Sequence, residues 1–129
     1  MENNSEKNNH YKKDVGFSGE NRAAFYLEKN GYKILQRNFT IRGGELDIVA
    51  YKNDTLVIVE VKTLPNGNFE TLKDSLNRRK IKSVIRTTKH FLQKYRQYSN
   101  SYIRFDVIAL DLPNTEPVFH IENAFSEIL

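Results

Sequence analysis

The chain has 129 residues, of which 39% are hydrophobic and 28% charged, a composition typical of one globular domain with a proper core. It contains no cysteine, which excludes a disulfide framework, a cysteine zinc site and a thiol nucleophile. The formal net charge of +4 permits a polyanionic partner without requiring one. No apolar run approaches the roughly 20 residues that span a bilayer, so we expect a cytoplasmic protein with no membrane partner.

The N-terminal residues 1–14 are polar, rich in Asn and Lys, and lack the apolar core of a signal peptide. We expect them to form a flexible tail, followed by a single domain over residues 15–129. Helical spacing then predicts a helix over residues 18–30, with Ser18 as its N-cap and Gly31 as its stop. Glu20 lies on the buried side of its first turn, either favoured there by the helix dipole or aimed at a metal.

A first strand is predicted over residues 32–41, ended by Gly43 and Gly44. Two runs rich in β-branched residues, 46–51 and 56–61, flank Asn53-Asp54 and predict a β-hairpin. A two-residue loop would place Lys52 opposite Thr55, Asp47 opposite Glu60, and Glu45 opposite Lys62.

This register puts two like charges on one face of the hairpin, which destabilises a strand pair. A divalent cation held by oxygen ligands would offset the repulsion between Asp47 and Glu60. The alternative is that this face is open to solvent and that its charges are ordinary surface residues.

Residues 64–69 are predicted as a loop and residues 71–95 as one long helix. One side of that helix is apolar, and the remainder is basic with a single acid. Such a surface is either simply solvated or suited to phosphate contacts. A strand over residues 102–110 should then run parallel to the second hairpin strand or a near neighbour, and residues 118–121 should add a short edge strand, where His120 is packed or solvated.

The order helix, three strands, basic helix and strand carries an ordered set of motifs between Gly16 and Leu110: GFSGENRAAFYLEKNGYKIL, QRNF, GGELDIVA, VIVEVKT, RRK and RFDVIAL. This set closely resembles the PD-(D/E)XK nuclease superfamily, and most of all the YraN-type family of small bacterial proteins with a Holliday-junction-resolvase-like fold. The resemblance implies an α/β fold with a restriction-endonuclease-like core, a mixed sheet of four to five strands in the order αβββαβ, and helices on its faces. The family pattern has Arg soon after E-V-K-T, where this chain has Leu64, which leaves one basic contact beside the site unsupported.

By the same resemblance, Glu20, Asp47, Glu60 and Lys62 match the catalytic residues. The implied Mg²⁺ ion, for which Mn²⁺ would substitute, is held by Asp47, Glu60, the carbonyl of Val61, and Glu20. The basic residues implied in nucleic-acid binding are Arg78, Arg79, Lys80 and Lys82.

The resulting hypothesis is a Mg²⁺-dependent endonuclease acting on DNA, with a homodimer favoured if both strands are cut symmetrically. A nucleic-acid-binding protein that does not cleave is the first alternative, and a module whose basic helix docks an acidic protein is the second.

Overall fold

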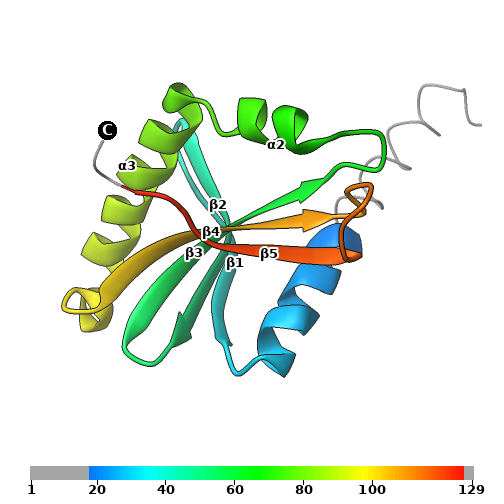
Figure 1. The fold of residues 1–129 in the computed structure, drawn as a ribbon. Helices are drawn as coiled ribbons and strands as arrows, with labels where there is room; N and C mark the ends of the chain where they lie inside the picture. The colour runs from blue at the N-terminus through cyan, green and yellow to red at the C-terminus, as the bar shows by residue number, and fades with distance from the viewer. Residues whose placement is uncertain (1–17, 127–129) are drawn as a thin grey trace, which may run out of the picture.

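The computed structural model describes residues 18–126, so the predicted tail over residues 1–14 lies outside the described residues. Its centre is a five-stranded sheet in the order β1-β2-β3-β4-β5 (Figure 1). The strands are β1 (Lys33–Ile41), β2 (Gly44–Lys52), β3 (Thr55–Thr63), β4 (Tyr102–Leu110) and β5 (Val118–Phe125). Only the β3–β4 pair is parallel, so the sheet is mixed.

The predicted hairpin is present as β2 and β3. Asn53 and Asp54 both adopt left-handed backbone, with φ of 50° and 58°, which makes the two-residue turn that these residue types tolerate. The register from Lys52–Thr55 to Ile48–Val59 confirms the predicted pairing. The ladder ends there, so the predicted direct pairs Asp47–Glu60 and Glu45–Lys62 do not form.

The connection from β3 to β4 is helical, and β4 runs parallel to β3 as predicted. The prediction of a single helix over residues 71–95 was wrong, because the connection holds α2 (Phe69–Ser75), α3 (Arg78–Lys94) and the short 3₁₀ helix η1 (Arg96–Tyr98). The break lies at Asn77, whose side-chain oxygen accepts a hydrogen bond from the Lys80 N–H at 2.9 Å and so starts α3.

Helices cover both faces of the sheet. Residues 18–29 are helical, and Ala23, Ala24 and Leu27 pack on one face. Helices α2 and α3 lie on the other face, where Leu72 and Phe91 join separate apolar clusters. The first helix stops where Gly31 has a φ of 86°, and the Tyr32 N–H bonds the Leu27 carbonyl at 3.0 Å, which confirms the predicted glycine stop.

The strand β5 is longer than the predicted residues 118–121 and reaches Phe125. Its pairing with β4 is irregular between Phe105 and Val107, and Asn123 has left-handed backbone, with its N–H bonded to Asp106. The order of elements and the mixed sheet are those of the expected α/β fold and are consistent with its restriction-endonuclease-like core. Within residues 18–126, no helix is long and apolar enough to cross a membrane.

Candidate functional site

The strands β2 and β3 separate beyond the Ile48–Val59 pair, and Asp47 lies where they part. Its Oδ2 accepts a hydrogen bond from the backbone N–H of Val61 at 2.9 Å. The other side of β2 continues to pair with β1 as far as Ile41–Gly44. The Asp47 carboxylate therefore replaces a ladder hydrogen bond to β3 and is held beside Glu60, the residue that precedes Val61.

Glu60 is a buried carboxylate on the face of the sheet that α3 covers. Its side chain is only 1% exposed. Both carboxylate oxygens are buried, and neither has a hydrogen-bond partner within the described residues. Burial raises the pKa of Glu60 to about 7, and the charge of Asp47 adds to the rise, while the ammonium groups of Lys80 and Lys62 oppose it. The ionised form is thus poorly stabilised by the protein itself.

Lys80 supplies the nearest cation to Glu60. Its Nζ lies 3.2 Å from Glu60 Oε2 and forms an ion pair with it. Lys80 belongs to the first turn of α3, which Asn77 caps, and its side chain is 34% exposed. The Lys80 ammonium therefore faces both Glu60 and solvent.

Glu20 is oriented by strand β1 rather than by the other carboxylates. Its Oε2 accepts a hydrogen bond from Asn38 Nδ2 at 3.1 Å and lies 3.5 Å from Arg37 Nη2. The neighbouring Gly19 lies so close to β3 that a Cβ there would come 2.9 Å from Thr63 Oγ1. This close approach keeps Glu20 near the end of β3, but the structure does not bring it into the group around Glu60.

The structure thus brings together Asp47, Glu60, Lys62 and Lys80, and leaves Glu20 at the side. Within residues 18–126 there is no group of three or more His, Cys, Asp or Glu side chains placed to hold a metal ion. Two carboxylates remain, Asp47 and Glu60, and Glu60 has an ion pair with Lys80 but no hydrogen-bond partner for its buried oxygens within the described residues. This oxygen-only set fits Mg²⁺, which often takes one or two protein carboxylates and keeps several waters.

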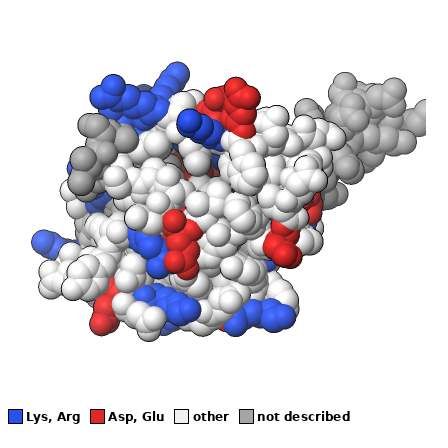
Figure 2. Space-filling model, in the orientation of Figure 1, with Lys and Arg blue, Asp and Glu red and all other residues white. Residues whose placement is uncertain are grey.

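A basic surface lies where α3 begins. Figure 2 shows Lys and Arg gathered over the end of the molecule at which α3 starts in Figure 1. Arg78, Arg79 and Lys82 are exposed there, and the first turn of α3 contains no acid. Cations at a helix N-terminus oppose the helix dipole and reduce stability. An anionic ligand at this end would relieve that cost.

Sequence reasoning did not find the polar network around Asp106, which is fully buried in β4. Its carboxylate accepts hydrogen bonds from the Arg104 guanidinium and from the Asn123 N–H at 2.9 Å. It also lies 2.7 Å from His120 Nε2. Burial by itself would raise the pKa of Asp106, but the hydrogen bonds from His120, Arg104 and Asn123 outweigh it and hold the pKa below its usual range. The sequence signal that could have revealed this network is the acid Asp106 within the otherwise apolar second half of β4.

His120 completes this network, and its packing confirms the prediction that it is packed or solvated. Its side chain is 6% exposed, and its Nδ1 lies 3.3 Å from the Tyr26 hydroxyl. The two residues come from β5 and from the helix over residues 18–29. The network therefore fastens β5 to β4 and to that helix, and it has a structural role.

Comparison with known proteins gives one consistent family. The model of the uncharacterised protein family UPF0102 matches residues 19–110. A UPF0102 protein of Persephonella marina is 40% identical over 110 residues, covering 85% of this chain and 91% of the relative. One of Clostridium perfringens is 37% identical over 118 residues, covering 92% and 90%. The family model and these relatives agree, and the chain therefore belongs to the UPF0102 family, which is the YraN-type family.

Proposed function

We propose that this protein is a metal-dependent nuclease that hydrolyses phosphodiester bonds of DNA, including branched intermediates of repair or recombination. The observation that supports it best is Glu60, whose buried carboxylate oxygens have no hydrogen-bond partner within the described residues and lie beside a second acid. Lys80 offsets only part of the cost of burying this charge, and a dication held by oxygen ligands would offset the remainder.

The proposed metal ligands are Asp47 and Glu60, with the carbonyl oxygen of Val61, and Glu20 would reach the ion through water from its place at the side of the group. The chemistry that Mg²⁺ or Mn²⁺ supplies at such a site is neutralisation of charge on the scissile phosphate and a lower pKa for water. The Val61 N–H fixes the orientation of the Asp47 carboxylate, and Asn38 with Arg37 fixes that of Glu20. These contacts preorganise the acids before substrate binds.

The remaining tasks fall to the lysines. Lys62 is half-buried on β3, two residues after Glu60, where its ammonium can donate to the attacking water or to the phosphate oxygens as their charge develops. Lys80 balances part of the Glu60 charge and is exposed enough to reach a phosphate. In this proposal, both ammonium groups would contact the phosphate that the metal ion also binds.

Substrate binding is assigned to the start of α3. Arg78, Arg79, Lys80 and Lys82 present positive charge around the first turn of α3, where the positive end of the helix dipole also lies. Phosphate contacts carry affinity but no sequence information. We therefore propose recognition by the shape of the nucleic acid rather than by its base sequence.

A second candidate function is a nucleic-acid-binding protein that does not cleave. The observation in its favour is that Lys80 already lies against Glu60, while the described residues hold no group of three metal-ligating side chains. A lysine in place of a metal would neutralise Glu60 without creating a hydrolytic site.

The two functions are separated by incubating the protein with branched, duplex and single-stranded DNA in Mg²⁺, Mn²⁺ or EDTA. Glu60→Gln is the test variant, because it keeps the size of the side chain and removes its charge. Glu28→Gln, an exposed acid of the first helix, is the matched control. A nuclease cuts in metal, fails in EDTA, and loses activity with Glu60→Gln only. Salt-sensitive binding of all DNA without any cutting would instead establish the binding protein.

A further inference from the structure

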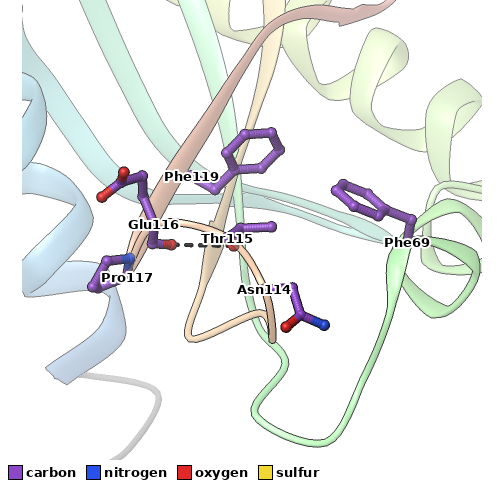
Figure 3. A pocket seen from close by; sticks show the side chains of 6 residues that line it. All are labelled: Phe69, Asn114, Thr115, Glu116, Pro117 and Phe119. Carbon is purple, nitrogen blue, oxygen red and sulfur yellow. Dashed lines mark hydrogen bonds between the residues drawn. The ribbon is translucent and has the colours of Figure 1, made fainter.

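A hollow of about 480 Å³ lies between the start of α2 and the connection from β4 to β5. Figure 3 shows the Phe69 and Phe119 rings above the loop that carries Asn114, Thr115, Glu116 and Pro117. The two rings meet edge to face, with centroids 6.0 Å apart. The Phe69 side chain is nevertheless 57% exposed, so a large aromatic surface faces solvent at this place.

The hollow and the candidate site both lie toward the carboxyl ends of β3 and β4. Strands β3 and β4 are parallel, so their carboxyl ends meet at one edge, and Glu60 and Lys62 belong to the last residues of β3. The chain leaves β3 toward Phe69 and leaves β4 toward Asn114. The Leu64 N–H bonds the Leu110 carbonyl at 2.9 Å and holds the two exits together. A strand of nucleic acid bound at Glu60 can therefore extend over this hollow.

The wall opposite Phe69 is held in place before any ligand binds. The Asp111 N–H bonds the Pro117 carbonyl at 3.0 Å and closes the loop, while the Thr115 hydroxyl bonds the Leu112 carbonyl at 2.8 Å. Leu112 itself is buried in the core. A preformed wall reduces the entropy lost on binding.

The lining combines a stacking surface with a hydrogen-bonding group. The Asn114 amide lines the hollow, makes no hydrogen bond within the described residues, and offers both a donor and an acceptor (Figure 3). The carboxylate of Glu116 points to the side away from Phe69, so it places little negative charge beside the exposed ring. An aromatic face next to a free amide suits a flat, polar-edged ring, the chemistry of a nucleobase.

We propose that the hollow between the Phe69–Phe119 ring pair and the loop of residues 111–117 receives an unpaired base of the nucleic acid that the candidate nuclease site binds. This inference rests on the proposed function and deepens it, because it makes the preferred substrate a structure with at least one unpaired nucleotide next to the scissile bond. The base stacks against Phe69, and Asn114 contacts its edge. Fully paired duplex cannot fill the hollow unless a base leaves the helix, which costs energy.

The test measures dissociation constants by fluorescence anisotropy in EDTA, for blunt duplex and for a junction with an unpaired segment. Phe69→Ala is the test variant, and its exposed side chain makes the substitution safe for folding. Phe25→Ala is the matched control, because Phe25 is also exposed, at 64%, but lies on the first helix. Stacking of one base on an aromatic side chain predicts at least about a fivefold loss of affinity for the junction with Phe69→Ala. Duplex binding and the control variant should be unchanged.

Two further arms decide the origin of the effect. Removing single bases from the unpaired segment, leaving the backbone intact, should reproduce the fivefold loss in wild type at one position and have no effect in Phe69→Ala. A second variant, Asn114→Gly, suits the left-handed backbone at that residue and should weaken the same complex. Equal losses on duplex and junction, or none on either, would overturn the inference. Metal-dependent cutting by wild type would then still support the proposed nuclease, whereas absence of any DNA binding would refute both.

Discussion

Replacing Glu60 with glutamine should stabilise the protein above neutral pH when no divalent cation is present. The pKa of Glu60 is raised from 4.5 to about 7 in the folded protein, chiefly by burial and then by Asp47. Below pH 4.5 the carboxyl group is protonated in both the folded and the unfolded state, and the group contributes no penalty. Between pH 4.5 and 7 the unfolded chain loses this proton while the folded chain keeps it, so the free energy of unfolding falls as the pH rises.

The size of this loss follows from the pKa difference. One pKa unit corresponds to about 1.4 kcal/mol, so the rise from 4.5 to about 7 predicts a loss of about 3 kcal/mol by pH 8. Glutamine is neutral at every pH, so the variant should not lose this free energy of unfolding as the pH rises. Its amide leaves Lys80 without its carboxylate, but the Lys80 side chain is 34% exposed and can turn to solvent. Wild type and Glu60→Gln should therefore agree near pH 4.5 and diverge toward pH 8.

The assay is urea unfolding followed by circular dichroism at several pH values in EDTA, with Glu28→Gln as the control for an exposed acid. Adding Mg²⁺ at pH 8 should raise the free energy of unfolding of wild type by about 1.4 kcal/mol for each tenfold excess over the dissociation constant, and should leave Glu60→Gln unchanged. Parallel pH profiles for wild type and Glu60→Gln would refute the account of Glu60 as a strained buried acid. An equal response of both proteins to Mg²⁺ would remove Glu60 from the proposed metal ligands.

Asp106→Asn should lower the free energy of unfolding by about 3 kcal/mol or more, because a buried charge with three sets of donors is replaced by a neutral group, and urea unfolding measures it. Since the pKa of Asp106 is held low, its contribution should persist above its unfolded pKa and disappear as the pH falls through the folded value. Gly44→Ala should cost about 1–3 kcal/mol because its Cβ would overlap Thr87 Oγ1, and Thr87→Ala should recover part of that loss in the double variant, as a double-mutant cycle would show. Gly31→Ala, at a φ of 86°, should lower the melting temperature through strain at the end of the first helix, and an unchanged melting temperature would contradict that role.

Local chemistry explains which parts of the fold could be predicted. Asn53 and Asp54 accept left-handed backbone wherever they occur, so the turn and the neighbouring register follow from residue type and the two-residue period of a strand. Gly31 ends its helix for a similar local reason. The break at Asn77 was missed because its side chain competes with the helix for one N–H, a difference of a single hydrogen bond that apolar periodicity does not report.

The amino-acid sequence by itself determined the strands, the parallel crossover, the family, and the acids and lysines that compose the candidate site. Only the tertiary structure decided how these groups meet: Asp47 bonds the Val61 N–H, Lys80 lies against Glu60, and Asn38 orients Glu20. The physical reason is that these contacts depend on where the strands part and how the helices pack on the sheet. These contacts arise from burial and hydrogen bonding over the whole domain, and local residue propensities do not predict them.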